Sequence, residues 1–323
     1  MSNARSRPGA VRALRAAIMS PSPIPALLMS PIRYKQLDVF AARHGGGNPL
    51  GVVVDAQGWS DSRMQRFAHW TNLVETTFLM PPRVDGADYR ARIYTPTKEI
   101  PFAGHPTIGS AHAALDAGLV TPDAAGIVWQ ECGAGVLPIR VEGDGPTREL
   151  FVQSPKARIV GDASRGGETL SAVLYGVKLG ALAPACVEGG RRWWVAEFAD
   201  ESVLRGWRPD HAAIRALALA TDTLGLCVFA RSAEGLAVRA FPAGVGIVED
   251  PASGAANGLI AAYVAERDTS GALANGYVVS QGREVGHDAR IIIRIDGDAV
   301  WVGGRTNTII DGHVDWQEWE PAA

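Results

Sequence analysis

The stretch "EIPFAGHPTIGSAHAALDAG" (Glu99–Gly118) places a histidine and a proline directly before a run of small residues. The run predicts a helix over about Thr107–Ala117, which Gly118 would end. Asp116 is the only charged residue on this helix, and a helix without a polar face is buried on most of its sides. We therefore expect strands to surround the helix and to approach it closely.

A second stretch, "VEDPASGAANGLIAAYV" (Val248–Val264), has the same character. When His105 is aligned with Asp250, both stretches read X-Pro-x-x-Gly-x-Ala. The second run predicts a helix over about Gly254–Glu266. The repetition predicts an α+β fold of two pseudo-symmetric domains, each a mostly antiparallel sheet wrapped around a central helix.

The domain organisation follows from this duplication. We expect a tail over residues 1–30, an N-terminal lobe over 31–148 and a C-terminal lobe over 149–304. A final strand at 305–320 is the candidate that would complete the N-terminal lobe. The tail carries four arginines and no acidic residue, so we interpret it as disordered, or as translation begun upstream of a natural start at Met29.

Composition excludes several classes of partner. The 323 residues are 47% hydrophobic and 20% charged, with a net charge of −3, so no broad basic surface for nucleic acid is expected. No apolar run approaches the roughly 18 residues that a membrane span needs. Three cysteines without CxxC spacing argue against a disulfide framework and indicate a cytoplasmic protein.

The starts of the two small-residue helices predict a binding site. The first turn of a helix has unpaired N–H groups at the positive end of its dipole, and a glycine-rich entry lets an anion approach them. If the two domains face each other, both helix starts point into one cleft, with His105 and Asp250 on opposite walls. The predicted ligand is a small carboxylate. Asp250 followed by Pro251 could also be only a helix N-cap.

Glu75 is the third candidate. It lies in "LVETTFLM" (Leu73–Met80), which predicts a strand with Glu75, Thr77 and Leu79 on one face. Apolar neighbours raise a carboxyl pKa towards neutrality, where the group can both take and return a proton.

Metal and nucleotide cofactors are not expected. None of the seven histidines lies in an HExxH motif, "RHGGGNP" lacks the GK[ST] of a phosphate-binding loop, and "GVGIVE" fails the GxGxxG spacing. We therefore predict no cofactor and no metal.

Five segments together resemble the PhzF-like family: "GNPLGVVVDA", "NLVETTFLMPP", "DYRARIYTPTKEIPFAGHPTIGSAHAAL", "VEDPASGAANG" and "SQGREVG". They occur in the family's order, and the similarity runs from about Tyr34 to Gly304. The family has the diaminopimelate epimerase fold. Its namesake is a cofactor-independent isomerase of phenazine biosynthesis, which moves a proton within trans-2,3-dihydro-3-hydroxyanthranilate.

The resemblance implies roles for individual residues. Glu75 would carry the proton, and His105 and Asp250 would orient the substrate and support proton movement. Gly104 and Gly254 would let the backbone approach the substrate. The same motifs supply the other expected substrate-binding residues, Pro106, Thr107, Ser253 and Ala255. Relatives of this kind pair as homodimers, which we expect here too.

The sequence also departs from the family pattern. Ala255 replaces the family's usual serine, "QGREVGHDA" (Gln281–Ala289) lacks an arginine and a serine, and "GGGNP" lacks an aromatic residue before GNP. A different small acid is therefore an open alternative, as are a two-base epimerase or racemase using Glu75 with Asp250, and a ligand-binding relative without turnover. A two-thiol epimerase is excluded, because no cysteine lies near either helix start.

Overall fold

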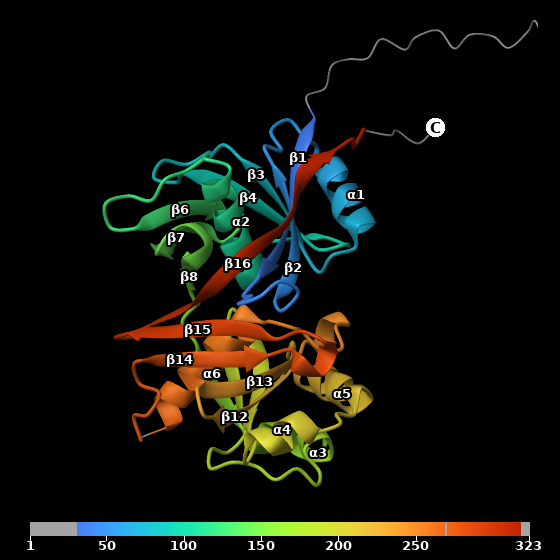
Figure 1. Ribbon diagram of the computed structural model, residues 1–323. Coiled ribbons are helices and arrows are strands. Elements are labelled where there is room, and N and C mark those ends of the chain that lie inside the picture. Colours follow the sequence, from blue (N-terminus) through green and yellow to red (C-terminus); the bar gives the residue numbers. More distant parts are fainter. Residues whose placement is uncertain (1–30, 269, 318–323) are drawn as a thin grey trace, which may run out of the picture. The chain divides into compact units, whose positions relative to one another are not determined.

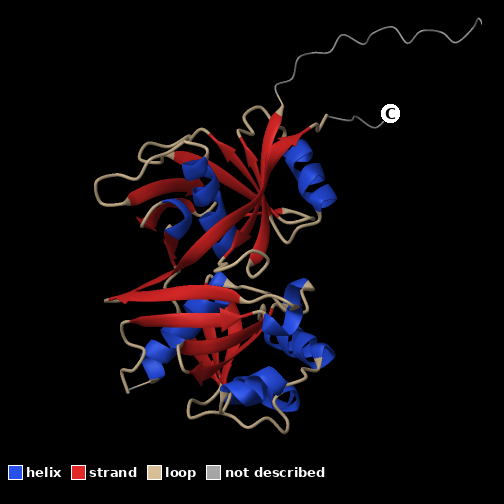
Figure 2. Ribbon diagram, viewed as in Figure 1, coloured by secondary structure: helices blue, strands red, loops and turns tan. Residues whose placement is uncertain are grey.

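The computed structural model describes residues 31–268 and 270–317, and the predicted tail lies outside these residues. Strands wrap around two helices, α2 (Gly104–Asp116) and α6 (Gly254–Arg267), as Figures 1 and 2 show. Each of these helices contacts the strands that surround it. The predicted α+β architecture is therefore confirmed.

The strands around α2 close into a ring, because β1 pairs with both β2 and β16. In spatial order the ring contains β1 (Ile32–Val39), β2 (Asn48–Val54), β3 (Thr76–Met80), β4 (Tyr89–Tyr94), β6 (Ile127–Cys132), β7 (Gly135–Glu142), β8 (Glu149–Gln153) and β16 (Ala299–Val314). The short β5 (Glu99–Ile100) pairs with β4. We call this ring, with α1 (Asp61–Thr71) and α2, the N-terminal lobe.

The strands around α6 continue from the other side of β16. In spatial order they are β15 (Ala289–Asp296), β14 (Gly276–Gln281), β13 (Gly235–Phe241), β12 (Gly225–Ser232), β11 (Arg191–Glu197), β10 (Ala185–Gly189) and β9 (Arg158–Asp162). Their helices are α3 (Ala163–Val173), α4 (Glu201–Gly206) and α5 (His211–Thr221), besides α6. We call this group the C-terminal lobe.

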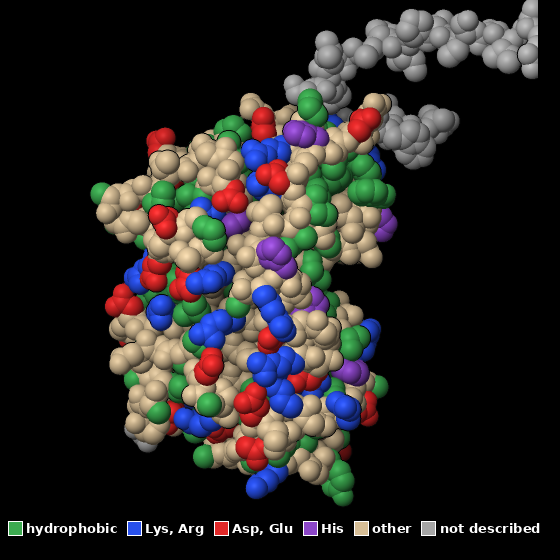
Figure 3. Space-filling view, in the orientation of Figure 1, with side chains coloured by type: hydrophobic (Ala, Val, Ile, Leu, Met, Phe, Trp, Pro, Cys, Tyr) green, Lys and Arg blue, Asp and Glu red, His purple; other side chains and the backbone are tan. Residues whose placement is uncertain are grey.

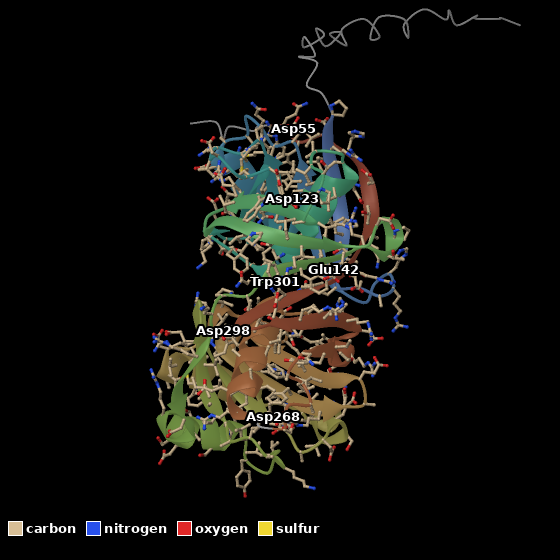
Figure 4. All side chains as sticks on the ribbon, turned by 90° about the vertical axis from the view of Figure 1, so that its left-hand side faces the viewer. Asp55, Asp123, Glu142, Asp268, Asp298 and Trp301 are labelled. Carbon is tan, nitrogen blue, oxygen red and sulfur yellow. The ribbon has the colours of Figure 1, made fainter. Side chains whose placement is uncertain are left out.

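Both lobes are mostly antiparallel. Parallel pairing is limited, among the described strands, to β2–β3, β4–β6, β11–β12 and β13–β14. β16 pairs with β15 on one side and with β8 on the other, so this one strand belongs to both lobes (Figure 1). Trp301 of β16 lies at the junction of the lobes in Figure 4, and the Arg140 guanidinium stacks 3.9 Å from the centre of its ring.

The exact residues at which one lobe ends and the other begins stay a proposal. β8 begins at Glu149 and pairs with β7 and β16, so the ring extends past the expected boundary at residue 148. The expected final strand at 305–320 is the second half of β16, which ends at Val314, and residues 318–320 lie outside the described part of the chain.

Small residues are needed where the central helices meet their strands. A side chain at Gly109 of α2 would collide with Leu50 and Val39, and one at Gly258 of α6 would collide with Ser154. The patterns that predicted buried helices therefore reflect close helix–strand packing.

Surface features of the described residues match the composition. No helix among them is long and apolar enough to cross a membrane. On the face drawn in Figure 3, basic and acidic side chains are interspersed.

Candidate active site

The first central helix begins earlier than expected. α2 starts at Gly104, with Ala103 as its N-cap, so the predicted start at Thr107 is wrong by three residues. Pro106 is tolerated in this first turn because N–H groups there have no intrahelical partner. His105 therefore lies within the first turn, where its side chain is 7% exposed.

The second central helix begins at Gly254, as predicted. Its N-cap is Ser253, whose Oγ accepts from the Ala256 N–H at 3.3 Å, so the interpretation of Asp250 as the N-cap is wrong. Asp250 lies in the preceding turn, where its N–H donates to the Ala240 carbonyl at 2.9 Å.

The two helices meet start to start. A Cβ atom on Gly104 would lie 3.3 Å from the Cα atom of Gly254, which is tighter than most real contacts of this kind. Because Gly104 and Gly254 are the first residues of their helices, the structural counterpart of His105 is Ala255. The predicted alignment of His105 with Asp250 followed the prolines and has the wrong register.

Glu75 and His105 lie together. Glu75 immediately precedes β3, which begins at Thr76, so the expected strand start at Leu73 is wrong. Glu75 Oε2 lies 3.4 Å from His105 Nε2, and the Glu75 side chain is 12% exposed. Neither atom has a hydrogen-bond partner among the described residues, although both are buried. Unpaired buried polar atoms are uncommon and mark a site that can take a polar ligand.

Burial changes the pKa values of all three candidate residues. It raises the pKa of Glu75 to about 8, with a further contribution from the negative charge of Asp250. It raises the pKa of Asp250 to about 6 and lowers the pKa of His105 to about 3. At pH 7, Glu75 is therefore mostly protonated, Asp250 mostly ionised and His105 neutral. Two carboxyls with separated pKa values are typical of acid–base sites.

Asp250 is held by residues that the sequence analysis did not select. Asn48 Nδ2 donates to Asp250 Oδ1 at 2.9 Å, and the Ala252 N–H donates to the same oxygen at 3.2 Å. Gln281 Nε2 donates to the Asp250 carbonyl at 2.8 Å. The "GNP" and "QG" motifs that contain Asn48 and Gln281 were the only sequence signals for them.

A buried ion pair lies next to Asp250. Both Arg239 and Glu249 are less than 5% exposed, and their two hydrogen bonds are each 2.9 Å long. The Arg239 guanidinium also donates to the Trp207 carbonyl at 2.7 Å. The backbone before Asp250 is thereby anchored to the C-terminal lobe.

The expected substrate-binding residues differ in exposure. Gly104 and Gly254 are partly exposed and Ala255 is exposed, whereas Pro106, Thr107 and Ser253 are buried. The Thr107 Oγ1 accepts from Gln130 Nε2 at 3.4 Å inside the N-terminal lobe. The glycines and Ala255 are therefore better placed to meet a ligand.

Neither a metal site nor a thiol site is evident among the described residues. They contain no group of three or more His, Cys, Asp or Glu side chains that could hold a metal ion. Cys132, Cys186 and Cys227 are buried and free, and burial raises the pKa of each thiol. None of them lies at a helix start, which agrees with the exclusion of a two-thiol mechanism.

Sequence comparison gives a match to a known family over most of the chain. Residues 37–312 match the family model of phenazine biosynthesis-like proteins (PhzC–PhzF). A trans-2,3-dihydro-3-hydroxyanthranilate isomerase from Pseudomonas aeruginosa is 33% identical, covering 87% of this chain and 98% of the relative. Antisense-enhancing sequence 1 from Schizosaccharomyces pombe is 32% identical, covering 86% and 97%.

Solved structures share the fold. A PhzF-family protein from Bacillus anthracis has a TM-score of 0.74 at 23% identity, covering 88% of this chain and 99% of that one. A probable proline racemase from Agrobacterium radiobacter has a TM-score of 0.58 at 13% identity, covering 90% and 94%. The fold is thus that of the PhzF and diaminopimelate epimerase-like proteins.

Proposed function

Because the chain belongs to the phenazine biosynthesis-like isomerase family, we propose that it moves a proton between two carbons of a small carboxylate substrate, with Glu75 as the proton carrier. The observation that supports this most strongly is the enclosed Glu75 carboxyl, 3.4 Å from a neutral His105. The proposed reaction needs no cofactor, since it creates no net oxidation or reduction.

In the proposed mechanism, ionised Glu75 takes a proton from a carbon next to an activating group. The electron pair of the broken C–H bond enters the conjugated system of the substrate, and Glu75 becomes a neutral carboxylic acid. That acid then returns the proton to another carbon on the same face, which restores the carboxylate. A pKa near 8 suits both steps close to neutral pH.

The two helix starts supply the proposed substrate contacts. First-turn N–H groups of α2 and α6 favour an anionic group, and the glycines at Gly104 and Gly254 keep side chains out of its way. His105 and Asp250 would hold the polar substituents. Ala255 offers only a methyl group where the family usually has a hydroxyl, so we expect the substrate to make no side-chain hydrogen bond there.

The first experiment uses trans-2,3-dihydro-3-hydroxyanthranilate, the substrate in the name of the relative from Pseudomonas aeruginosa. Purified protein is incubated with it and the products are followed by NMR. The wild type should form a constitutional isomer, and Glu75→Gln should not, while Glu234→Gln, at an exposed glutamate, serves as the control. Equal rates for wild type and Glu75→Gln would remove Glu75 from the mechanism.

A two-base epimerase is the second candidate, because Asp250 also has a raised pKa and interacts electrostatically with Glu75. Such an enzyme inverts one centre and incorporates solvent deuterium at it. A relative that only binds its ligand would show neither product, but would still be stabilised thermally by the ligand.

We also propose a cytoplasmic homodimer, by analogy with the family. Light scattering of the purified protein tests the dimer directly, since a monomer mass at micromolar concentration would contradict it.

A further inference from the structure

Asn48 is an N-terminal-lobe residue whose side chain reaches the turn that carries Asp250. It is fully buried at the first position of β2. Its amide nitrogen donates to Asp250 Oδ1 at 2.9 Å and to the Ala252 carbonyl at 3.0 Å. A carbonyl can only accept, so the nitrogen, and not the oxygen, must face this turn. The Asn48 Oδ1 makes no hydrogen bond within the described chain, so the amide bonds only on the Asp250 side.

The backbone before Asn48 is fixed on both sides. The Gly47 N–H donates to Asp38 Oδ1 at 2.9 Å, and the Gly47 carbonyl lies 2.6 Å from His287 Nδ1. The Asp288 N–H donates to the Gly46 carbonyl at 2.8 Å. The Asp38 contact ties the loop before β2 to β1, and the His287 and Asp288 contacts tie it to the C-terminal lobe. The direction of the Asn48 side chain is therefore set by its surroundings.

The opposite side of the Asp250 turn is held by Gln281, which is also fully buried. Gln281 Nε2 donates to the Asp250 carbonyl, and its Oε1 accepts from Asn257 Nδ2 at 2.8 Å and from the Ser253 N–H at 3.3 Å. Gln281 therefore fixes the Asp250 backbone to the start of α6. The carboxylate receives its side-chain amide donor from Asn48.

We propose that Asn48 is a positioning residue, which reaches across the lobes to orient the Asp250 carboxylate and to keep it ionised for the reaction. This inference rests on the proposed function for its catalytic consequence. Asn48 acts through Asp250 and is assigned no step of the proton transfer itself.

Removing the Asn48 amide should change the protonation of Asp250. Burial raises the pKa of Asp250, and hydrogen bonds to the charged carboxylate oppose this rise. They come from the Ala252 N–H, the Ser253 side chain and the Asn48 amide, and the nearby His287 acts in the same direction. In Asn48→Ala the Asp250 titration should move to higher pH by about one unit. At pH 5 the ionised fraction of Asp250 should then be about tenfold lower in Asn48→Ala than in the wild type, and kcat/KM should fall with it.

The test is an NMR titration of the Asp250 side-chain carboxyl carbon in the wild type and in Asn48→Ala. The matched control is Asn307→Ala, because the Asn307 amide also donates to a carbonyl, that of Ala41. Among the described residues, Asn307 forms no hydrogen bond with Asp250. We expect the Asp250 midpoint to rise in Asn48→Ala and to stay unchanged in Asn307→Ala. A midpoint that is equal in all three proteins would overturn the proposal.

A second measurement needs no variant, and therefore covers an Asn48→Ala protein that does not fold. In the wild type, the side-chain amide resonance of Asn48 should shift with the same midpoint as Asp250, whereas that of Asn307 should not. If the Asn48 amide resonance does not shift as Asp250 titrates, the contact is refuted.

The two proposals fail in different ways. Both titrations are independent of turnover, so a wild type without isomerase activity would contradict the proposed function and leave the positioning role to the NMR result. If the wild type is active, its kcat/KM profile should have one limb near pH 8 from Glu75 and a second limb near pH 6 from Asp250. The second limb should move to higher pH in Asn48→Ala. A merely structural role would lower stability without moving that limb.

Discussion

Replacing Glu75 by glutamine should change how the stability of the protein depends on pH. Burial and the charge of Asp250 raise the pKa of Glu75 from its ordinary value of 4.5 to about 8. The folded state therefore binds this proton more tightly than the unfolded chain does. The stabilisation is fully present below pH 4.5 and is lost as the pH rises through 8.

The magnitude follows from the linkage relation. One pKa unit corresponds to about 1.36 kcal/mol. At pH 7.5, about three units above the ordinary pKa of 4.5, the free energy of unfolding of the wild type is therefore lower by about 4 kcal/mol than at low pH. The side chain is only 12% exposed, so solvent screening reduces this little. Glutamine has nearly the same shape and no charge, so Glu75→Gln should match the wild type near pH 4.5 and be about 4 kcal/mol more stable at pH 7.5.

Urea unfolding at intervals between pH 4.5 and pH 9 measures this difference. Glu234→Gln is the control, because that glutamate is exposed and pairs with Arg290 at the surface. Curves for wild type and Glu75→Gln that stay parallel over the whole range would refute the argument that Glu75 is buried with a raised pKa.

Three further predictions concern the same region. The value of kcat/KM should rise with pH and level off above about pH 8, because Glu75 must be ionised to take a proton; a profile already flat from pH 6 would contradict this role. Gly104→Ala should lower kcat/KM about tenfold while costing about 1 kcal/mol of stability, because the new methyl lies 3.3 Å from the Gly254 Cα and separates the helix starts. Wild-type kinetics in this variant would show that the close approach is unimportant. Arg239→Met should destabilise the protein by about 3–5 kcal/mol in urea, because it leaves Glu249 buried without its partner; a loss below about 1 kcal/mol would exclude a strong buried pair.

Regular elements with clear local signals could be predicted from the sequence. In "SDSRMQRFAHWTN" (Ser60–Asn72) a serine precedes a stretch whose apolar residues share one face, and this pattern predicts a helix. The structure has α1 there, with Ser60 as its N-cap and a left-handed Asn72 as its C-cap. The run "HAAIRALALA" (His211–Ala220) likewise predicts α5, and the predicted helix from Gly254 to about Glu266 is α6. α3 was missed because Gly166 and Gly167 interrupt its pattern, and Gly167 indeed has a non-helical backbone with φ of 51°.

The site was only partly accessible to the same reasoning. The duplicated small-residue helices indicated that two helix starts would meet, which the packing of Gly104 against Gly254 confirms. The register of the duplication was wrong because it aligned prolines, although the helices begin at glycines. The Asn48–Asp250 contact spans 202 residues, and no local pattern carries such information.

The central claim is that an enclosed Glu75 carboxyl carries one proton between two carbons. It is tested most directly by a single turnover in ordinary water with substrate that carries deuterium on the carbon to be deprotonated. Retention of a substantial part of that deuterium at the new position in the product is the predicted result. Complete loss of the label to solvent, at a rate equal to that of product formation, would contradict the account.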